Sequence, residues 1–167
     1  MLQLFCKKTA DSLSFDLCMD LGTSNCLAWE KNMAVMLDEP SVVAVETQTG
    51  GVVAVGRDAR RMRGRTPAGI RTVRPIDAGT IARWRPAEDM ISHLVQSARE
   101  KVPPRKRMLP PRVLMAAPSD LTQVEIRALQ SCARRAGAGK IYMVDKPIAG
   151  ALGAGLPVSA PIGSMFV

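Results

Sequence analysis

Hydrophobic and polar residues alternate through the first third of the chain, which is the pattern of strands with one buried face. Leu17, Met19 and Leu21 alternate with Asp16, Cys18 and Asp20, and similar runs follow. Asp38-Glu39-Pro40 interrupts the pattern, and Thr49-Gly50-Gly51 reads as the turn of a hairpin. The predicted strands in this part are 15–21, 25–30, 33–37, 41–46 and 52–56.

Helical spacing dominates the second half of the chain. Pro86 opens a predicted helix that runs to about Val102 and carries one apolar stripe, formed by Met90, Ile91, Leu94, Val95 and Ala98. Further helices are predicted over 57–65, 122–136 and 145–155, strands over 112–117 and 141–144, and a loop-rich connection over 66–80. This order predicts an α/β fold with a partly parallel sheet covered by helices.

Composition narrows the class of protein. The 167 residues are 47% hydrophobic with 4% aromatics, which indicates one or two small domains with an aliphatic core. The chain has no apolar run near the roughly 20 residues of a membrane span, and its start does not have the order of a secretory signal peptide. The four cysteines lack metal-ligand spacing, so Cys18 and Cys26 are predicted to be buried free thiols of a cytosolic protein.

The formal net charge of +8 comes mainly from arginine. Such charge attracts nucleic acid, anionic lipid or acidic partners, and it is equally compatible with a solvated surface. The sequence carries no signature of a nucleic-acid-binding module, and Tyr142 is its only tyrosine, so aromatic stacking platforms are scarce. We therefore expect no nucleic-acid partner.

The segment Asp20-Leu21-Gly22-Thr23-Ser24-Asn25 is the main candidate for chemistry. It reads as a hairpin turn that needs Gly22 for an unusual backbone angle. Successive N–H groups in such a turn can hold phosphate oxygens, helped by the hydroxyls of Thr23 and Ser24. Asp20 is placed to hold Mg²⁺ through water. The competing interpretation is an ordinary polar hairpin turn.

Beyond this turn, the chain resembles the MreB family of bacterial actins in register from about Asp16 to Val167. The matching stretches are 39–45 (Glu-Pro-Ser-Val-Val-Ala-Val), 55–56, 61–62, 64–67, 74–75, 79, 81–82, 111–113, 117–119, 124–125, 127–128, 136–138, 147, 149, 151 and 153–157. The resemblance implies the N-terminal lobe of an actin-like ATPase. Its expected architecture is a ribonuclease-H-like mixed sheet with helices on both faces and a small inserted hairpin subdomain.

The resemblance also implies a domain division. Residues 14–37 and 76–160 would form the ribonuclease-H-like lobe (subdomain IA), and 38–75 the inserted small subdomain (IB). Residues 1–13 are a candidate amphipathic membrane leader, and 161–167 would begin a second lobe whose phosphate loop is absent from this chain. We therefore expect the chain alone to bind ATP weakly or not at all, and not to turn it over.

ATP and Mg²⁺ are the cofactors that the resemblance implies. Gly22, Thr23, Ser24 and Asn25 match the positions that contact the ATP phosphates, and Asp20 matches the position near Mg²⁺. Glu125 matches the glutamate associated with the attacking water. Thr122-x-x-Glu125 is also a capping box, which explains Glu125 without any catalytic role.

The activity that the resemblance implies is ATP-dependent assembly of filaments that govern cell shape and wall synthesis. Its partners would be further copies of the protein, the inner face of the cytoplasmic membrane and the wall-elongation machinery. Apolar residues beside basic ones suggest two membrane contacts: Leu2, Leu4 and Phe5 in the leader, and Met108 and Leu109 after the basic run 105–107. A frayed tail and a solvated loop are the alternatives.

Three places depart from the family pattern, one of them Asp77-Ala78, which stands in place of a Lys-Asp pair. Asp145-Lys146-Pro147 stands in place of Glu-Glu-Pro, which reverses one charge, and Arg83 stands where aspartate is usual. Two alternative functions stay open. One is a non-catalytic fragment that binds membrane or filament, and the other is a sugar-kinase-like or chaperone-like ATPase of the same fold.

Overall fold

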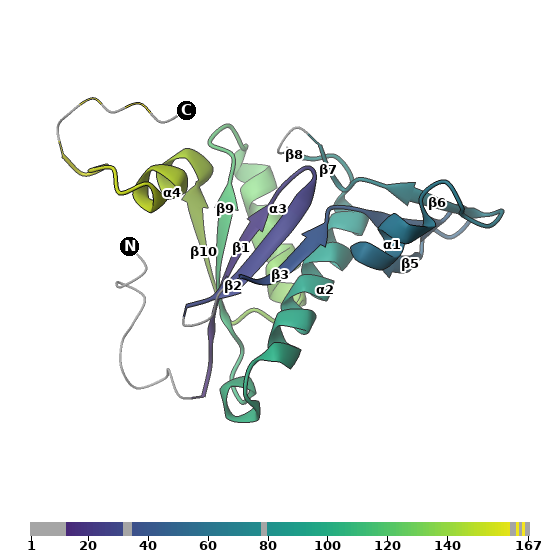
Figure 1. Cartoon of the computed structure of the whole chain (residues 1–167), viewed down its shortest axis with the longest axis horizontal. Coiled ribbons are helices and arrows are strands. Elements are labelled where there is room, and N and C mark those ends of the chain that lie inside the picture. The colour runs from purple at the N-terminus through teal and green to yellow at the C-terminus, as the bar shows by residue number, and fades with distance from the viewer. Residues whose placement is uncertain (1–12, 32–34, 78–79, 161–162, 164, 166–167) are drawn as a thin grey trace.

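A five-stranded mixed sheet forms the centre of the molecule in this computed structural model, which describes residues 13–31, 35–77, 80–160, 163 and 165 (Figure 1). Its strand order is β10-β9-β1-β2-β3. Strands β1, β9 and β10 run parallel, whereas β1–β2 and β2–β3 pair antiparallel. The bounds are β1 Asp16–Leu21, β2 Asn25–Glu30, β3 Val35–Pro40, β9 Arg112–Ala117 and β10 Lys140–Asp145. The predicted partly parallel sheet is confirmed.

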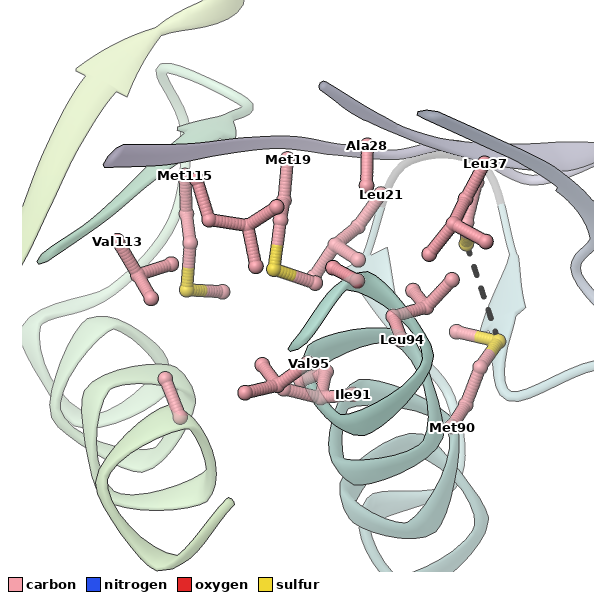
Figure 2. Close-up of a cluster of buried hydrophobic side chains, with 14 of the residues drawn as sticks. Met19, Leu21, Ala28, Leu37, Met90, Ile91, Leu94, Val95, Val113 and Met115 are labelled. Atoms are coloured by element: carbon pink, nitrogen blue, oxygen red, sulfur yellow. Dashed lines mark hydrogen bonds between the residues drawn. The ribbon is translucent and has the colours of Figure 1, made fainter. Parts of the chain in front are cut away.

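Two long helices, α2 (Trp84–Lys101) and α3 (Gln123–Arg135), cover one face of this sheet. The core lies between them and the strands, where the side chains of α2 point toward those of β1 and β3 (Figure 2). All five residues of the predicted α2 stripe are buried: Met90, Ile91, Leu94, Val95 and Ala98. The helical spacing in the sequence therefore identified the buried side of α2 correctly.

The last described helix, α4 (Lys146–Gly153), begins on the opposite face of the sheet. Met19 and Leu21 belong to the core beneath α2 and α3. Asp20 lies between them, so its side chain projects from the other face. Lys146, the first residue of α4, forms an ion pair with Asp20. The sheet therefore carries helices on both faces, as the fold prediction requires.

A second, three-stranded sheet of order β5-β4-β6 lies beside the main one with helix α1, at the right of Figure 1. Its elements are β4 Val43–Glu46, β5 Val52–Val55, α1 Arg57–Met62 and β6 Ile70–Val73. The small core of this sheet is Val42, Ala44 and Ala59. These elements fall inside the range 38–75 predicted for the inserted subdomain, and that division stays a prediction.

Three details of the secondary structure differ from the prediction. Strand β3 continues through Pro40, because it is an edge strand where the missing N–H of proline costs no ladder bond. The segment 66–80 was predicted as a loop because of its prolines and glycines. It contains strand β6 and the start of a short strand pair, β7 (Ile76–Asp77) and β8 (Thr80–Ile81). A short 3-10 helix, η2 (Pro104–Arg107), follows α2.

Cys18, Cys26 and Cys132 are buried free thiols, which confirms the prediction for the first two. Burial raises the pKa of Cys26 to about 11, and burial together with the Asp16 carboxylate raises that of Cys18 to about 11. Both thiols are therefore protonated at neutral pH and act as core residues. No described helix combines the length and the apolar character that crossing a membrane requires.

Candidate functional site

The carboxyl ends of three parallel strands meet at one edge of the main sheet. Asp20 of β1 pairs with Ala116 of β9, and Asp145 of β10 pairs with Ala117. The turn 22–25 and the start of α4 follow these strand ends directly. In open α/β sheets, ligands bind outside the carboxyl ends of the strands, so this edge is the candidate site.

The turn 22–25 is tight, and this explains its glycine. A Cβ atom on Gly22 would lie 2.4 Å from the carbonyl oxygen of Asn25, a backbone atom that cannot move aside alone. Gly22 is absent from the glycines with a positive φ, so the unusual backbone angle expected for it is wrong. The reason for glycine is the close approach of the chain to itself. The backbone N–H of Ser41 fixes the turn by donating to the carbonyl of Ser24 at 2.8 Å.

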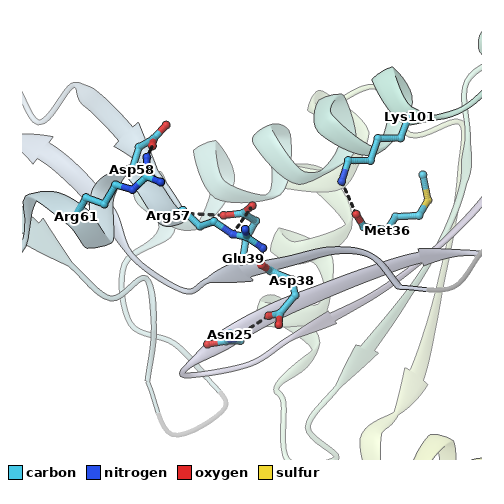
Figure 3. A network of polar contacts seen from close by, with 8 residues as sticks. All are labelled: Asn25, Met36, Asp38, Glu39, Arg57, Asp58, Arg61 and Lys101. Atoms are coloured by element: carbon cyan, nitrogen blue, oxygen red, sulfur yellow. Dashed lines mark hydrogen bonds and ion pairs between the residues drawn. The ribbon is translucent and has the colours of Figure 1, made fainter.

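Asn25 links this turn to helix α1 through a polar network (Figure 3). Its Nδ2 donates to Asp38 Oδ1 at 2.7 Å, and the Asp38 carbonyl accepts from Arg57 Nη2 at 3.1 Å. The backbone N–H of Arg57 donates to Glu39 Oε2 at 2.9 Å. The side chain of Asn25 is therefore engaged within the protein, while Thr23 is half-buried and Ser24 exposed.

An open pocket of about 410 Å³ lies beside Asn25. It is lined by Asn25, Asp38, Pro40, Arg57, Arg60 and Arg61. Arginine guanidinium groups suit an anionic ligand, and two of the three here, those of Arg57 and Arg61, also form ion pairs with Glu39 and Asp58. In the sequence these arginines register only as general positive charge, and the pocket was not predicted. The signal was present in their spacing, because residues three and four apart share one side of a helix.

Asp20, predicted to hold Mg²⁺ through water, has a lysine as its partner. Lys146 Nζ lies 2.8 Å from Asp20 Oδ1, an atom shielded from solvent, and donates a well-directed hydrogen bond to the Leu21 carbonyl at 2.9 Å. The contact with Oδ1 is an ion pair without hydrogen-bond geometry. Among the described residues, no group of three or more histidine, cysteine, aspartate or glutamate side chains could hold a metal. Lys146 thus occupies the place beside Asp20 Oδ1 that a cation would need, and Mg²⁺ binding at Asp20 stays a prediction.

Glu125 closes a capping box at the start of α3. Its Oε2 accepts from the Thr122 N–H at 2.8 Å and the Thr122 hydroxyl at 2.7 Å, and its own N–H donates to Thr122 Oγ1 at 3.3 Å. These bonds, the hydroxyl foremost, hold the pKa of Glu125 below its usual value. Their stabilisation is present above the unfolded-state pKa and is lost as the pH falls through the lowered folded-state pKa. The capping interpretation is confirmed, and water positioning stays a prediction.

The predicted membrane contact at Met108 and Leu109 is exposed on the surface, with 69% and 41% of these residues accessible. Two of the three neighbouring basic side chains are engaged in the fold, and Arg105 is exposed. Lys106 Nζ lies 2.8 Å from Glu30 Oε1, and Arg107 donates to the carbonyls of Val102 and Glu100 at the end of α2. Leu2, Leu4 and Phe5 lie outside the described residues, together with positions 1–12 of the predicted leader 1–13 and positions 161–162, 164 and 166–167.

Comparison with known proteins gives matches across almost the whole chain. The sequence profile of the MreB/Mbl protein family matches residues 14–167. The cell shape-determining protein MreB of Escherichia coli (strain K12) is 43% identical over 166 residues, which cover 96% of this chain and 47% of the relative. The chain thus spans about half the length of the curated relatives it matches.

Solved structures agree with this match. MreB5 of Spiroplasma citri, in a crystal structure bound to ADP, superposes with a TM-score of 0.75 at 32% identity, covering 90% of this chain and 44% of that one. MamK in a double helical filament superposes with a TM-score of 0.69 at 20% identity, covering 85% and 44%. The MamK match concerns the fold alone. These superpositions show that the chain has the fold of an actin-like lobe.

Proposed function

The chain belongs to the MreB/Mbl family, and from this premise we propose that it is the nucleotide-binding lobe of a cell-shape protein that assembles into ATP-dependent filaments at the inner face of the cytoplasmic membrane. The observation that carries the proposal is the tight turn 22–25 at the carboxyl edge of the sheet. The solved relative MreB5, with the same fold, was crystallised with ADP. The proposal includes wall synthesis because filaments of this family organise that process.

The turn suits the phosphate groups of ATP by its chemistry. Backbone N–H groups of Thr23, Ser24 and Asn25 and the two hydroxyls would donate to phosphate oxygens. The arginines of the neighbouring pocket add positive potential on the α1 side. ATP would supply a reactive phosphoryl group, whose transfer depends on positioning and on charge neutralisation. Glu125 is proposed to orient the attacking water, for which its carboxylate must first leave the cap of α3.

Nucleotide binding by the 167-residue chain tests the proposal. In a ¹H–¹⁵N NMR titration with ADP, we expect the amide signals of residues 22–25 to shift, with a weak Kd of about 1 mM. The affinity is low because this lobe contacts one side of the nucleotide. Gly22→Ala should abolish these shifts, since its methyl group would force the Asn25 carbonyl to move. A micromolar Kd would contradict the single-lobe expectation.

Gly153→Ala is the matched control, because a Cβ there meets nothing within 4 Å. It should leave the ADP shifts unchanged. In a protein that carries both lobes, Gly22→Ala is expected to remove ATP-dependent pelleting of filaments. Glu125→Gln is expected to keep pelleting and to lose phosphate release. Equal ADP binding by the Gly22→Ala and Gly153→Ala variants would refute the proposed role of the turn.

We also propose that the exposed pair Met108–Leu109 contacts the membrane. Apolar side chains at the tip of a segment can insert between lipid headgroups. In a liposome-pelleting assay with anionic vesicles, the double variant Met108→Asn, Leu109→Asn should pellet several-fold less than the parent chain. Val53→Asn is the control, because Val53 is an equally exposed apolar residue on β5. If Val53→Asn lowers pelleting as much as the double variant, this contact site is wrong.

A further inference from the structure

The ammonium group of Lys146 lies beside the Asp20 carboxylate, where a bound cation would otherwise neutralise that charge. The lysine is the first residue of α4, directly after the end of β10, and its side chain reaches the end of β1. There it contacts the Asp20 carboxylate and the Leu21 carbonyl, two acceptors on the same strand. The side chains of Lys146 and Asp20 retain 28% and 39% of their accessible surface, so this ion pair borders solvent at the edge where a ligand would enter.

The two contacts place the ammonium group beside the phosphate-binding turn. The carbonyl of Leu21 belongs to the peptide bond that joins Leu21 to Gly22, so Lys146 Nζ lies next to the first residue of the turn. An ammonium group has three N–H donors. The hydrogen bond to Leu21 uses one of them, and the contact with Asp20 Oδ1 is an ion pair without hydrogen-bond geometry, so at least one donor remains for a further acceptor. A phosphate oxygen in the turn would lie on the side of Gly22.

A divalent cation would have to compete with this arrangement. Mg²⁺ near Asp20 would sit close to a positive charge, and the two cations repel each other. A Mg²⁺ ion bound to Asp20 Oδ1 would also have to displace the ammonium group from this oxygen, which is shielded from solvent. Separating a partly buried ion pair leaves one charge without its partner, which is costly.

We propose that the Lys146 ammonium replaces a divalent cation at this site: it neutralises Asp20 and presents its remaining N–H to a bound diphosphate group, so that the turn 22–25 binds the diphosphate without Mg²⁺. This inference rests on the proposed function in one respect, namely that the turn accepts phosphate. The exclusion of divalent cations from Asp20 stands independently of it.

Two NMR titrations of the 167-residue chain test the proposal. Inorganic pyrophosphate, added in the presence of EDTA, should shift the amides of residues 22–25 as strongly as it does with Mg²⁺. Mn²⁺, added without pyrophosphate, should cause no selective paramagnetic broadening of the amides of residues 20–25. In Lys146→Met, pyrophosphate affinity in EDTA should fall about tenfold through loss of a charge-assisted hydrogen bond, and Mn²⁺ should now broaden the Asp20 signal.

Lys140→Met is the matched control, because it removes an exposed lysine from the other end of β10. It should behave as the parent chain in both titrations. Lys146→Gln is a second variant that keeps an N–H donor for the Leu21 carbonyl and loses the charge, and the dispersion of each spectrum reports folding directly. Selective Mn²⁺ broadening in the parent chain, or pyrophosphate binding that needs Mg²⁺, would overturn the proposal.

The two titrations separate this inference from the proposed function. If pyrophosphate shifts no amide in any variant, the phosphate role of the turn fails, and the diphosphate half of the proposal fails with it. Mn²⁺ broadening confined to Lys146→Met and Lys146→Gln would still support the replacement of a metal by Lys146. Absence of Mn²⁺ broadening from all variants would overturn that half as well, because Lys146 would then not be what excludes the metal.

Discussion

Replacement of Leu94 by alanine is expected to lower the free energy of unfolding by about 3 kcal/mol. Leu94 lies on the inner side of α2 and is fully buried against the strands of the main sheet (Figure 2). Its truncation removes buried apolar atoms and leaves a cavity, because α2 and the sheet cannot close the gap completely. Urea denaturation measures the loss as a lower midpoint with an unchanged slope.

Gln96→Ala is the control for this experiment, since Gln96 is exposed on the same helix. Surface substitutions of this kind stay within about 0.5 kcal/mol of the parent protein. A Leu94→Ala variant as stable as Gln96→Ala would show that α2 does not pack on the sheet as described. The experiment therefore tests the placement of α2, which connects the small sheet to β9.

Replacement of Lys106 by methionine is expected to lower the free energy of unfolding by about 3 kcal/mol. Lys106 Nζ lies 2.8 Å from Glu30 Oε1, and only 4% of the Glu30 side chain is accessible. Removing the lysine charge leaves a buried carboxylate without this partner, which costs more than the ion pair itself contributes. Methionine keeps most of the apolar stem, so the measured loss reports the charge.

Arg105→Met supplies the comparison, because Arg105 is the exposed neighbour in the same basic run. It should change the urea midpoint little. The double variant Glu30→Gln, Lys106→Met should recover part of the loss, since it removes both charges. A Lys106→Met chain as stable as Arg105→Met would contradict the structural role assigned to this lysine.

The role of Lys106 bears on the proposed membrane contact. In the sequence, Arg105, Lys106 and Arg107 together predict attraction for anionic lipid. In the structure, Lys106 pairs with Glu30, and Arg107 donates to carbonyls at the end of α2, as basic residues near a helix C-terminus commonly do. Membrane binding by this segment would therefore depend mainly on the apolar pair Met108–Leu109, with Arg105 as the exposed charge.

Most elements could be predicted from local patterns, and the errors have physical causes. The alternation around Met19 and the stripe around Leu94 each report one buried face, which the sequence carries directly. Pro40 was interpreted as the end of a strand, because a sequence does not show that its strand lies at a sheet edge. Strand β6 was missed because its four residues are flanked by Gly69 and Pro75, which are typical of loops.

The candidate site likewise has features that the sequence shows and features that only the structure shows. The turn 22–25 was recognisable because a short segment contains all its residues, although the reason for Gly22 came from its distance to the Asn25 carbonyl. The pairing of Lys146 with Asp20 joins residues far apart in the chain, and no spacing rule predicts it. The pocket at Arg57, Arg60 and Arg61 required the packing of α1 beside the end of β3.

The sequence by itself thus determined the family, the order of the main elements, the inner side of α2 and the location of the turn 22–25, for which phosphate binding is proposed. These features depend on residues that are neighbours along the chain or repeat with the period of a strand or helix. Only the tertiary structure decided which polar side chains meet: Lys146 with Asp20, Lys106 with Glu30, and Asn25 with Asp38. Each pair joins segments that are separated along the chain and adjacent in the fold, and an electrostatic interaction depends on distance in space.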